Sequence, residues 1–301
     1  MIMENTCFRL SNSNEMPIFG FGTFPQKEKL LQSIPTAAKM GYRFVDTSDD
    51  YQNIEWVGKA ISQMKQEKPI IETKFSDPTM LFEMQKEYYR FKKALELKDD
   101  EVIDILLLHF PYPYVYVDMW KELEKLYEQG KCKVIGVCNF EIEHLEILKK
   151  NCKYVPMINQ FELHPTFRRM ELCKYCNDNH IAIMSYSPFA RMNKSLIDNE
   201  KLLNIAKKYN KNVPQIIIRW NLQNGYIPIP GSSSESHIKS NIDVFDFELS
   251  EEDMKEIDSI DIGMRIRYDP KTKWGHRVKI RNLFIHMRYL FNQRVSLNFW
   301  T

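Results

Sequence analysis

Short runs of β-branched and aliphatic residues alternate with longer amphipathic stretches along most of this 301-residue chain. A strand, a helix and a further strand build a unit of parallel sheet, so the alternation restricts the fold to the α/β class. The predicted strands are 42–47, 69–75, 103–110, 133–139, 156–162, 181–188, 226–231 and a short 242–245. The predicted helices are 27–40, 54–64, 82–97, 116–129, 141–151, 168–179, 199–209, 213–223 and 235–241.

Eight strands in this arrangement predict a closed (β/α)8 TIM barrel. The strand cores, such as IDILLLHF and IAIMSYSP, are nearly continuous apolar runs, which is typical of strands buried on both faces. A doubly wound sheet is the alternative and usually carries G-x-G-x-x-G after its first strand. Here Gly20-Phe21-Gly22 is followed by Pro25 in place of a third glycine, which disfavours that fold. The segment CFRLSNSNEMPIFGFG predicts a hairpin that caps one end of the barrel.

Composition and charge disfavour several classes of protein. Charged residues are 27% of the chain but the net charge is only +2, whereas a dedicated nucleic-acid binder is strongly basic. No apolar window is long enough for a transmembrane helix, and MIMENTCFRL lacks the pattern of a signal peptide. We therefore expect a cytoplasmic protein without stable membrane insertion, a monomer or weak dimer with reduced cysteines.

The pair Cys173 and Cys176 forms a C-x-x-C sequence, which can indicate redox or metal chemistry. No second pair of cysteines and no nearby pair of histidines completes a zinc site. A free cysteine also packs as a small hydrophobic residue. We therefore expect these two side chains in the core face of a helix, and no metal site.

Polar or aromatic residues end six successive predicted strands. They are Asp46, Lys74, His109, Asn139, Gln160 and Tyr186. In a β/α barrel the carboxyl ends of the strands form the mouth, where catalytic residues lie. Asp46 and Lys74 are expected to pair, because either charge alone would be costly to bury. Tyr51 follows Asp46 by five residues, on the loop over the mouth.

These side chains suit the reduction of a carbonyl, which needs a hydride at carbon and a proton at oxygen. An unperturbed tyrosine has a pKa of about 10, and a nearby cation lowers it. Lys74, held by Asp46, is expected to lower the pKa of Tyr51 in this way. His109 is expected to donate a hydrogen bond to the carbonyl oxygen and polarise it.

The chain resembles the aldo-keto reductases. The matching motifs are MPIFGFGTF at 16–24, GYRFVDTSDDYQN at 41–53, ETK at 72–74, LLLHFP at 106–111, LEKLYEQGKCKVIGVCNF at 123–140, NQFELHP at 159–165, SYSPFA at 185–190 and IPGSSSESHIKSNIDVFDFELS at 229–250. The resemblance covers roughly residues 6–262, which we expect to form the barrel of a single domain spanning 1–301. Residues 263–301 are expected to be a divergent C-terminal extension.

The resemblance implies an NAD(P)H-dependent reductase of aldehydes or ketones, with a catalytic tetrad of Asp46, Tyr51, Lys74 and His109. It implies NADPH as cofactor, with NADH as the alternative, and a substrate pocket at Tyr51 and His109 walled by Phe24 and Phe110. Asn139 and Gln160 would hold the nicotinamide carboxamide and Tyr186 would stack on the ring. The implied cofactor site comprises Gly22, Thr23, Asp46, Cys138, Asn139, Gln160, Tyr186, Ser187, Gly231, Ser232, Ser233, Ser234, His237 and Asn241.

Three positions depart from the family pattern. Cys138 replaces a serine hydroxyl that bonds the carboxamide, and a thiol is a weaker donor. Gly231 and His237 replace a lysine and an arginine at the adenosine-phosphate site. We therefore expect NADPH to be preferred over NADH with weak discrimination. Retention of the whole tetrad favours an active reductase over the other hypothesis, a cofactor-binding regulatory or interaction module on the same barrel.

The C-terminal extension is strongly basic. Residues 264–301 hold nine Lys and Arg and one acid, Asp269. Within 278–294 an apolar stripe recurs at helical spacing, with basic side chains mostly off it: the stripe is Ile280, Leu283, Phe284, Met287 and Phe291, and the bases are Lys279, Arg281, Arg288 and Arg294. Such a helix can lie on an anionic membrane or bind a partner. We expect instead that the stripe packs on the barrel, with Trp274 and Trp300 as further anchors.

Overall fold

The computed structural model describes residues 7–298, without the side chains of residues 276–277 and 293–298. Its strands are β1 (Cys7–Arg9), β2 (Glu15–Pro17), β3 (Phe21–Gly22), β4 (Phe44–Asp46), β5 (Ile70–Phe75), β6 (Ile103–Leu108), β7 (Cys132–Cys138), β8 (Ile158–Glu162), β9 (Ala182–Tyr186) and β10 (Ile227–Pro228).

The helices are α1 (Leu30–Lys39), α2 (Ile54–Ser62), α3 (Met84–Ala94), α4 (Tyr116–Glu128), α5 (Ile142–Asn151), α6 (Met170–Asp178), α7 (Lys194–Ile197), α8 (Glu200–Lys208), α9 (Val213–Gln223), α10 (Glu235–Ile242), α11 (Glu251–Asp258) and α12 (His276–Asn298). Three short 3-10 helices are η1 (Asp49–Tyr51), η2 (Pro78–Phe82) and η3 (Ala190–Met192).

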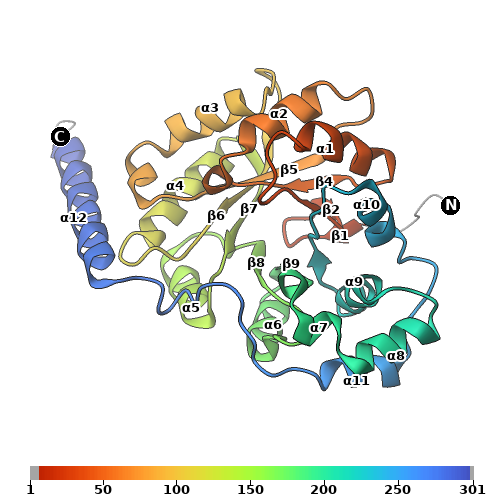
Figure 1. Cartoon of the computed structure of the whole chain (residues 1–301). Coiled ribbons are helices and arrows are strands. Elements are labelled where there is room, and N and C mark those ends of the chain that lie inside the picture. Colours follow the sequence, from red (N-terminus) through yellow and green to blue (C-terminus); the bar gives the residue numbers. More distant parts are fainter. Residues whose placement is uncertain (1–6, 299–301) are drawn as a thin grey trace.

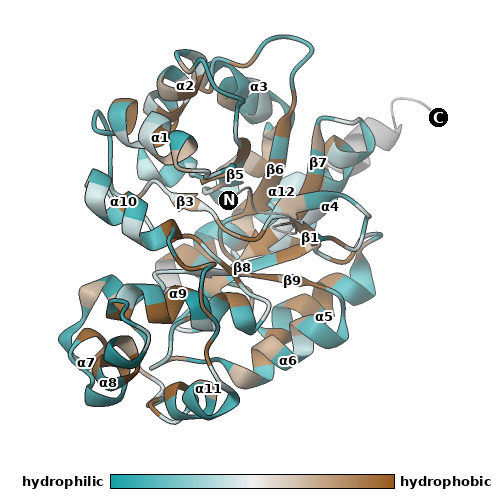
Figure 2. Ribbon diagram, turned by 90° about the vertical axis from the view of Figure 1, so that its right-hand side faces the viewer, coloured by the Kyte–Doolittle hydropathy of each residue, from teal (hydrophilic) through white to brown (hydrophobic). Residues whose placement is uncertain are grey.

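Strands β3 to β10 form one eight-stranded parallel sheet whose spatial order follows the chain. Figure 1 shows its central strands with helices around them. The first and last strands are joined by backbone hydrogen bonds from Gly20 N to Pro228 O at 3.0 Å and from Gly22 N to Pro230 O at 3.1 Å, which close the barrel. Figure 2 shows hydrophobic strands such as β6 and β8 inside a ring of more hydrophilic helices. The expected TIM barrel is confirmed.

The N-terminal hairpin is confirmed but shorter than expected, because only β1 and β2 pair in antiparallel fashion. The expected strand at 242–245 is wrong. Ile242 ends α10, and Val244 is a buried core residue in the following turn. The missing barrel strand is β3, which the sequence interpretation had included in the hairpin. A two-residue strand beside glycines carries no period that could predict it.

All nine predicted helices are present: seven have shorter bounds, α9 has the predicted bounds, and α10 is one residue longer. Helices α7 and α11 were not predicted. The N-terminus of α11 is capped by Ser250, whose side chain accepts a hydrogen bond from Asp253 N. In α6, the free thiols Cys173 and Cys176 are both buried, which confirms that they pack in the core. Within residues 7–298, no helix has the length and hydropathy needed to cross a membrane.

The C-terminal extension first crosses the mouth of the barrel as a strap without regular secondary structure, residues 264–274, which includes a turn at Asp269–Lys273. Glu162 at the end of β8 accepts backbone hydrogen bonds from Ile266 N at 2.7 Å and Arg267 N at 2.8 Å. An ion pair of Arg265 with Glu141 adds a second attachment. Trp274 ends the strap against Tyr112, with ring centroids 5.2 Å apart, so it anchors the tail as expected. Trp300 lies outside the described residues.

Helix α12 then runs along the edge of the molecule beside α4 (Figure 1). His286 Nδ1 lies 2.6 Å from Asp118 Oδ2 of α4, and Tyr289 donates to Glu122 Oε1. Ile285 and Asn282 are buried on the same side of the helix. The expectation of a docked helix is therefore met, but through a mainly polar face.

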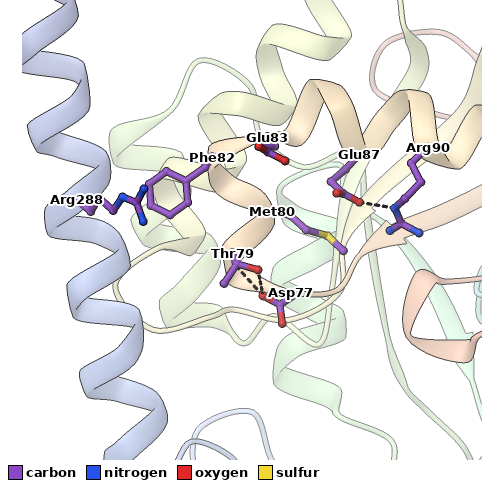
Figure 3. A pocket seen from close by; sticks show the side chains of 8 residues that line it. All are labelled: Asp77, Thr79, Met80, Phe82, Glu83, Glu87, Arg90 and Arg288. Atoms are coloured by element: carbon purple, nitrogen blue, oxygen red, sulfur yellow. Dashed lines mark hydrogen bonds and ion pairs between the residues drawn. The ribbon is translucent and has the colours of Figure 1, made fainter.

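The expected orientation of the apolar stripe is wrong. Its members face solvent, with exposed fractions of 67% for Phe284, 66% for Phe291 and 57% for Met287. Polar contacts with α4 decide the orientation of the helix, and hydrophobic periodicity does not register such contacts. At the inner edge Arg288 lies over the Phe82 ring and borders a cleft with acidic side chains (Figure 3).

Candidate active site

The carboxyl ends of the strands surround a cleft of about 610 Å³ at the mouth of the barrel. Asp46, Tyr51 and His109 line one end of it, and Asn139 and Tyr186 line its middle. Strand alternation explains the convergence, because the last inward-facing residue of each parallel strand points toward the barrel axis at the same level. The structure thus brings together residues that lie up to 140 positions apart in the sequence.

Lys74 lies fully buried at the centre of the site, between the carboxyl groups of Asp46 and Glu72. Its Nζ is 2.5 Å from Asp46 Oδ1, so the expected ion pair is present. It is also 2.8 Å from Glu72 Oε1 and donates to Thr47 O at 2.9 Å. These three acceptors satisfy all three donors of the ammonium. The charge is therefore fixed in position, 5.3 Å from the centroid of the Tyr51 ring.

Glu72 was not predicted as part of the site, although it lies in the ETK motif. Burial raises its pKa to about 8, although Lys74 acts in the opposite direction. Glu72 therefore holds a proton at neutral pH, which leaves Asp46 as the ionic partner of Lys74. A glutamate two residues before a buried lysine on one strand is the signal that could have identified it, because both point to the same side.

Tyr51 lies on η1, directly after β4, and its ring faces the cleft. Burial raises its pKa above the ordinary value, and the opposing effect of Lys74 is smaller. The expected net lowering of this pKa is wrong, because desolvation of the phenolate outweighs attraction to the ammonium. Tyr51 therefore stays protonated at neutral pH and can act only as a proton donor.

His109 stands edge-on to Tyr51, with ring centroids 5.8 Å apart. Its Nδ1 lies 2.9 Å from Ser76 Oγ and 3.1 Å from Ser48 Oγ. Burial lowers the pKa of His109 well below its usual range, and Lys74 adds to this effect, so the imidazole is neutral. When one of these serine hydroxyls donates to Nδ1, the proton resides on Nε2, which can donate to a ligand in the cleft. Neither serine was predicted from the sequence.

The residues expected to hold a carboxamide already form one network. Asn139 donates to His109 O at 3.1 Å and accepts from the Tyr186 hydroxyl at 2.6 Å. Gln160 lies deeper and fully buried, and its amide nitrogen is 2.9 Å from Asp46 Oδ1. The Cys138 thiol donates to Gln160 Oε1 at 3.4 Å. The network links the middle of the cleft to the Lys74 cluster.

Two glycines allow close approach of the chain where the barrel closes. A Cβ added at Gly231 would lie 2.4 Å from Gly22 O, and one at Gly22 would lie 2.7 Å from Ile229 O. Both glycines and Ser187 line the cleft. Thr23 does not line it, because it is fully buried behind the wall.

The predicted phosphate site begins where the cleft ends, at Gly231. Ser232 accepts a hydrogen bond from Ser234 N at 3.1 Å, and the Ser233 side chain is exposed. Ser234 is the N-cap residue of α10 but makes no side-chain cap. The first N–H groups of the helix therefore remain free of a cap from Ser234 and can bind an anion.

Two further residues predicted at this site lie on α10. His237 is exposed in the first turn, whereas Asn241 is buried one turn later. Glu235 opens the helix with an exposed acidic side chain that sequence reasoning did not consider. Its negative charge opposes the binding of a phosphate at this terminus.

The predicted substrate walls stand on opposite sides of the catalytic end. Phe24 lies against Tyr51 with ring centroids 5.1 Å apart, and 45% of its surface is exposed. Phe110 is buried and stacks on His109 at 4.6 Å. A carbonyl carbon between these rings would lie beside both the tyrosine and the histidine.

The residues of the cleft fit a nicotinamide dinucleotide. Its middle offers an aromatic face, Tyr186, and an amide, Asn139, which suit a carboxamide-bearing ring. Gly22 and Gly231 also line the cleft, at the place where the chain segments pack too closely for any Cβ. Three residues after Gly231, Ser234 begins α10 without a side-chain cap. This order of groups matches the order of ring, diphosphate and adenosine phosphate in such a cofactor.

Comparisons with known proteins agree with this geometry. Residues 16–262 match the model of the Aldo/keto reductase family. Glyoxal reductase of Bacillus subtilis (strain 168) is 41% identical over 266 residues, which are 87% of this chain and 95% of that protein. Methylglyoxal reductase DkgA of Escherichia coli (strain K12) is 36% identical over 279 residues, 90% of this chain and 98% of that protein.

Solved structures are similar over the same region. An aldo-keto reductase from a Medee basin deep-sea metagenome library has a TM-score of 0.85 and 36% identity, covering 89% of this chain and all of that one. A Bombyx mori aldo-keto reductase in complex with NADP has a TM-score of 0.82 and 29% identity, covering 90% and 97%. The chain therefore belongs to the aldo/keto reductase family of oxidoreductases.

Proposed function

We propose that this protein reduces an aldehyde or ketone to the alcohol with NADPH, and that Tyr51 donates the proton. The observation that carries the proposal is the position of Tyr51, which is protonated, faces the cleft and stands beside both Lys74 and His109. An acid, a hydrogen-bond donor and a fixed cation beside one carbonyl position are the groups that stabilise charge developing on its oxygen.

Bound NADPH supplies the hydride that adds to the carbonyl carbon. His109 Nε2–H donates a hydrogen bond to the carbonyl oxygen and orients it toward Tyr51. The Tyr51 hydroxyl then transfers its proton to that oxygen, which becomes the hydroxyl of the product. Lys74 stabilises the phenolate that remains, and Asp46 keeps the ammonium in place. Burial of the cluster strengthens each of these electrostatic effects by excluding water.

NADPH is the proposed cofactor, held by Asn139 and Tyr186 at the ring and by the start of α10 at its phosphate. Relatives of the chain with bound NADP or NADPH support the assignment. The start of α10 contributes free N–H groups but also Glu235, with His237 as the nearby basic side chain. Discrimination against NADH is therefore weak.

The proposed organisation is a single cytoplasmic domain, monomeric or weakly dimeric, acting on a small carbonyl compound without nucleic acid. The balanced charge of the chain supports the last point. The names of the reductases it resembles favour an active enzyme over a regulatory module on the same barrel.

The test is oxidation of NADPH, followed by its absorbance, with a panel of aldehydes and ketones that includes glyoxal and methylglyoxal. Turnover of at least one carbonyl compound, with the alcohol identified as product, is the expected result. Tight binding of NADPH without turnover of any compound would favour the regulatory module.

A further inference from the structure

The strap that crosses the mouth carries four basic side chains that fall into two groups. Arg265 lies 3.3 Å from Glu141, and Lys271 lies 3.0 Å from Glu143, so both are used to attach the strap to the barrel. Arg267 and Lys273 have no carboxylate within ion-pair distance among residues 7–298. The strap therefore holds two cations that its attachment does not require.

Both unpaired cations lie against the aromatic walls of the cleft. The Arg267 guanidinium lines the cleft, 5.7 Å from the centroid of the Phe24 ring. Lys273 Nζ is 3.2 Å from the centroid of Phe110 and 5.0 Å from that of Trp274. These rings stabilise a cation by cation–π attraction but leave its hydrogen-bond donors free. The two charges thus lie near the catalytic end without a carboxylate partner, and of the two Arg267 is the one that lines the cleft.

Their charges act on the catalytic end of the cleft. Burial and Lys74 lower the pKa of His109 well below its usual range, and Lys273 and Arg267 lower it further. Asp46 is the acidic residue among those that line the cleft, and it is already paired with Lys74. The space beside His109 therefore carries an excess of positive charge.

Lys273 also shows the cost of holding these charges. Burial lowers its pKa to about 8, although the nearby Asp50 acts in the opposite direction. A bound anion would stabilise the charged form of this lysine and so recover part of the desolvation cost. The family match ends at residue 262, so both cations belong to the part of the chain outside it.

We propose that the preferred substrate is a carbonyl compound that carries a carboxylate or phosphate, bound by Arg267 with Lys273 beside it. This inference rests on the proposed function, because the carbonyl group itself must lie at Tyr51 and His109. Arginine suits the role, since its planar guanidinium binds carboxylates and phosphates with two parallel hydrogen bonds.

The diphosphate of a bound cofactor would be another anion near the cleft, and a second arginine, Arg191, also lines the cleft. Arg191 follows β9 and lies on the Phe24 ring at 5.9 Å. It belongs to a left-handed turn in which Ala190, Arg191 and Met192 have φ of 45°, 56° and 60°. Three non-glycine residues in this conformation are strained, and such strain persists where the surrounding structure fixes it. We assign Arg191 to the diphosphate and Arg267, on the strap, to the substrate, and titration of NADPH tests this division.

The test compares pairs of aldehydes that differ in charge. These are 4-carboxybenzaldehyde with its methyl ester, and glyceraldehyde 3-phosphate with glyceraldehyde. In the wild type, kcat/KM should be at least tenfold higher for the charged member of one pair. In Arg267→Met that ratio should fall about ten- to a hundredfold, the loss of one charge-assisted contact. The control variant Lys271→Met, which removes a paired cation of the same strap, should keep the wild-type ratio.

Each other result contradicts a specific step. Equal kcat/KM within both pairs in the wild type, or an unchanged ratio in Arg267→Met, would overturn the anionic substrate. If Arg267→Met weakens NADPH binding in a fluorescence titration while the ratio is unchanged, Arg267 serves the cofactor and the inference is wrong. If the wild type reduces none of the four compounds and none of the wider panel, the proposed function is wrong, and this inference is wrong with it.

Discussion

Glu72 Oε1 lies 2.8 Å from Lys74 Nζ inside the barrel, where both side chains are fully buried. The two residues are separated by one position on β5, so both point to the barrel interior. The second carboxylate of the ammonium, Asp46, comes from the neighbouring strand β4. One cation thus faces two carboxyl groups. Burial raises the pKa of Glu72 to about 8, so this group is protonated and the excess negative charge is removed.

This arrangement predicts how stability depends on pH. The pKa of Glu72 is raised from an ordinary value of 4.5, so between pH 4.5 and 8 the folded protein binds a proton that the unfolded chain has released. Stability from this group is therefore full below pH 4.5 and is lost as the pH rises toward 8. In Glu72→Gln, which keeps the shape of the neutral acid, the fall in unfolding free energy from pH 5 to pH 8 should be smaller than in wild type.

Urea denaturation at the two pH values measures this difference. Glu55→Gln, which removes an exposed carboxyl on α2, serves as the control and should keep the wild-type dependence. If Glu72→Gln loses as much unfolding free energy over this range as the wild type, Glu72 is ionised at neutral pH and the description of the cluster is wrong.

Replacement of the proposed proton donor separates chemistry from binding. Tyr51→Phe removes the hydroxyl but keeps the ring that packs on Phe24. Turnover should fall about 10²–10⁴-fold, the usual contribution of a general acid. The dissociation constant for NADPH, measured by fluorescence quenching, should change little. The control is Tyr114→Phe, an exposed tyrosine after β6, which should leave kcat near the wild-type value.

A Tyr51→Phe variant that retains most of its turnover would assign the proton to another donor. His109 could not replace it as an acid at neutral pH, because its pKa is well below the usual range. Water would then be the remaining source of the proton, and kcat would not depend on the Tyr51 hydroxyl.

Much of the barrel could be predicted because its signal is local. Each long strand, such as β6 or β7, is an apolar run between two helical stretches. This alternation can be recognised directly in the sequence. The closing strand β3 could not be recognised, because two residues hold no period and their pairing with the β10 segment joins residues 208 positions apart, such as Gly20 and Pro228. The missed helix α11 did carry a local signal, the cap from Ser250 to Asp253.

The site divides in the same way. Asp46 and Lys74 were predictable as strand-end residues that must pair if buried. The sign of the Tyr51 pKa shift was not predictable, because the charge of Lys74 is visible in the sequence and the extent of burial is not. Ser48 and Ser76, which fix the His109 ring, come from two different loops and meet only in the fold.

Cofactor choice gives a further prediction. The start of α10 offers backbone N–H groups to a phosphate, but Glu235 stands in its first turn. The ratio of dissociation constants for NADH and NADPH should therefore stay below about a thousandfold, since each charge-assisted contact is worth roughly 1.5–3 kcal/mol. The variant Glu235→Gln should bind NADPH more tightly and keep the wild-type dissociation constant for NADH. The control is Lys239→Gln, which removes a charge from the same helix. Titration of both cofactors by fluorescence decides between these outcomes.

Deletion of residues 276–301 tests how α12 is attached. Among the α12 side chains that the structure describes, Ile285 is the buried apolar one, and the helix docks through the partly exposed contacts of His286 and Tyr289. Burial of a large apolar side chain contributes about 1.5–3 kcal/mol, and exposed ion pairs contribute about 0–1 kcal/mol each. Truncation should therefore lower Tm by only a few degrees.

Solubility should rise in the truncated protein, because the deletion removes the exposed side chains of Phe284 and Phe291 from the surface. The double variant Phe284→Ser with Phe291→Ser keeps the helix and should raise solubility by the same mechanism. Ile285→Ala, a change of similar size on the docked face, should lower Tm without this gain. If the truncated protein precipitates while the double variant stays soluble, barrel surface that the deletion exposes must cause the aggregation. The helix would then cover more of the barrel than its contacts with α4 and η2 account for.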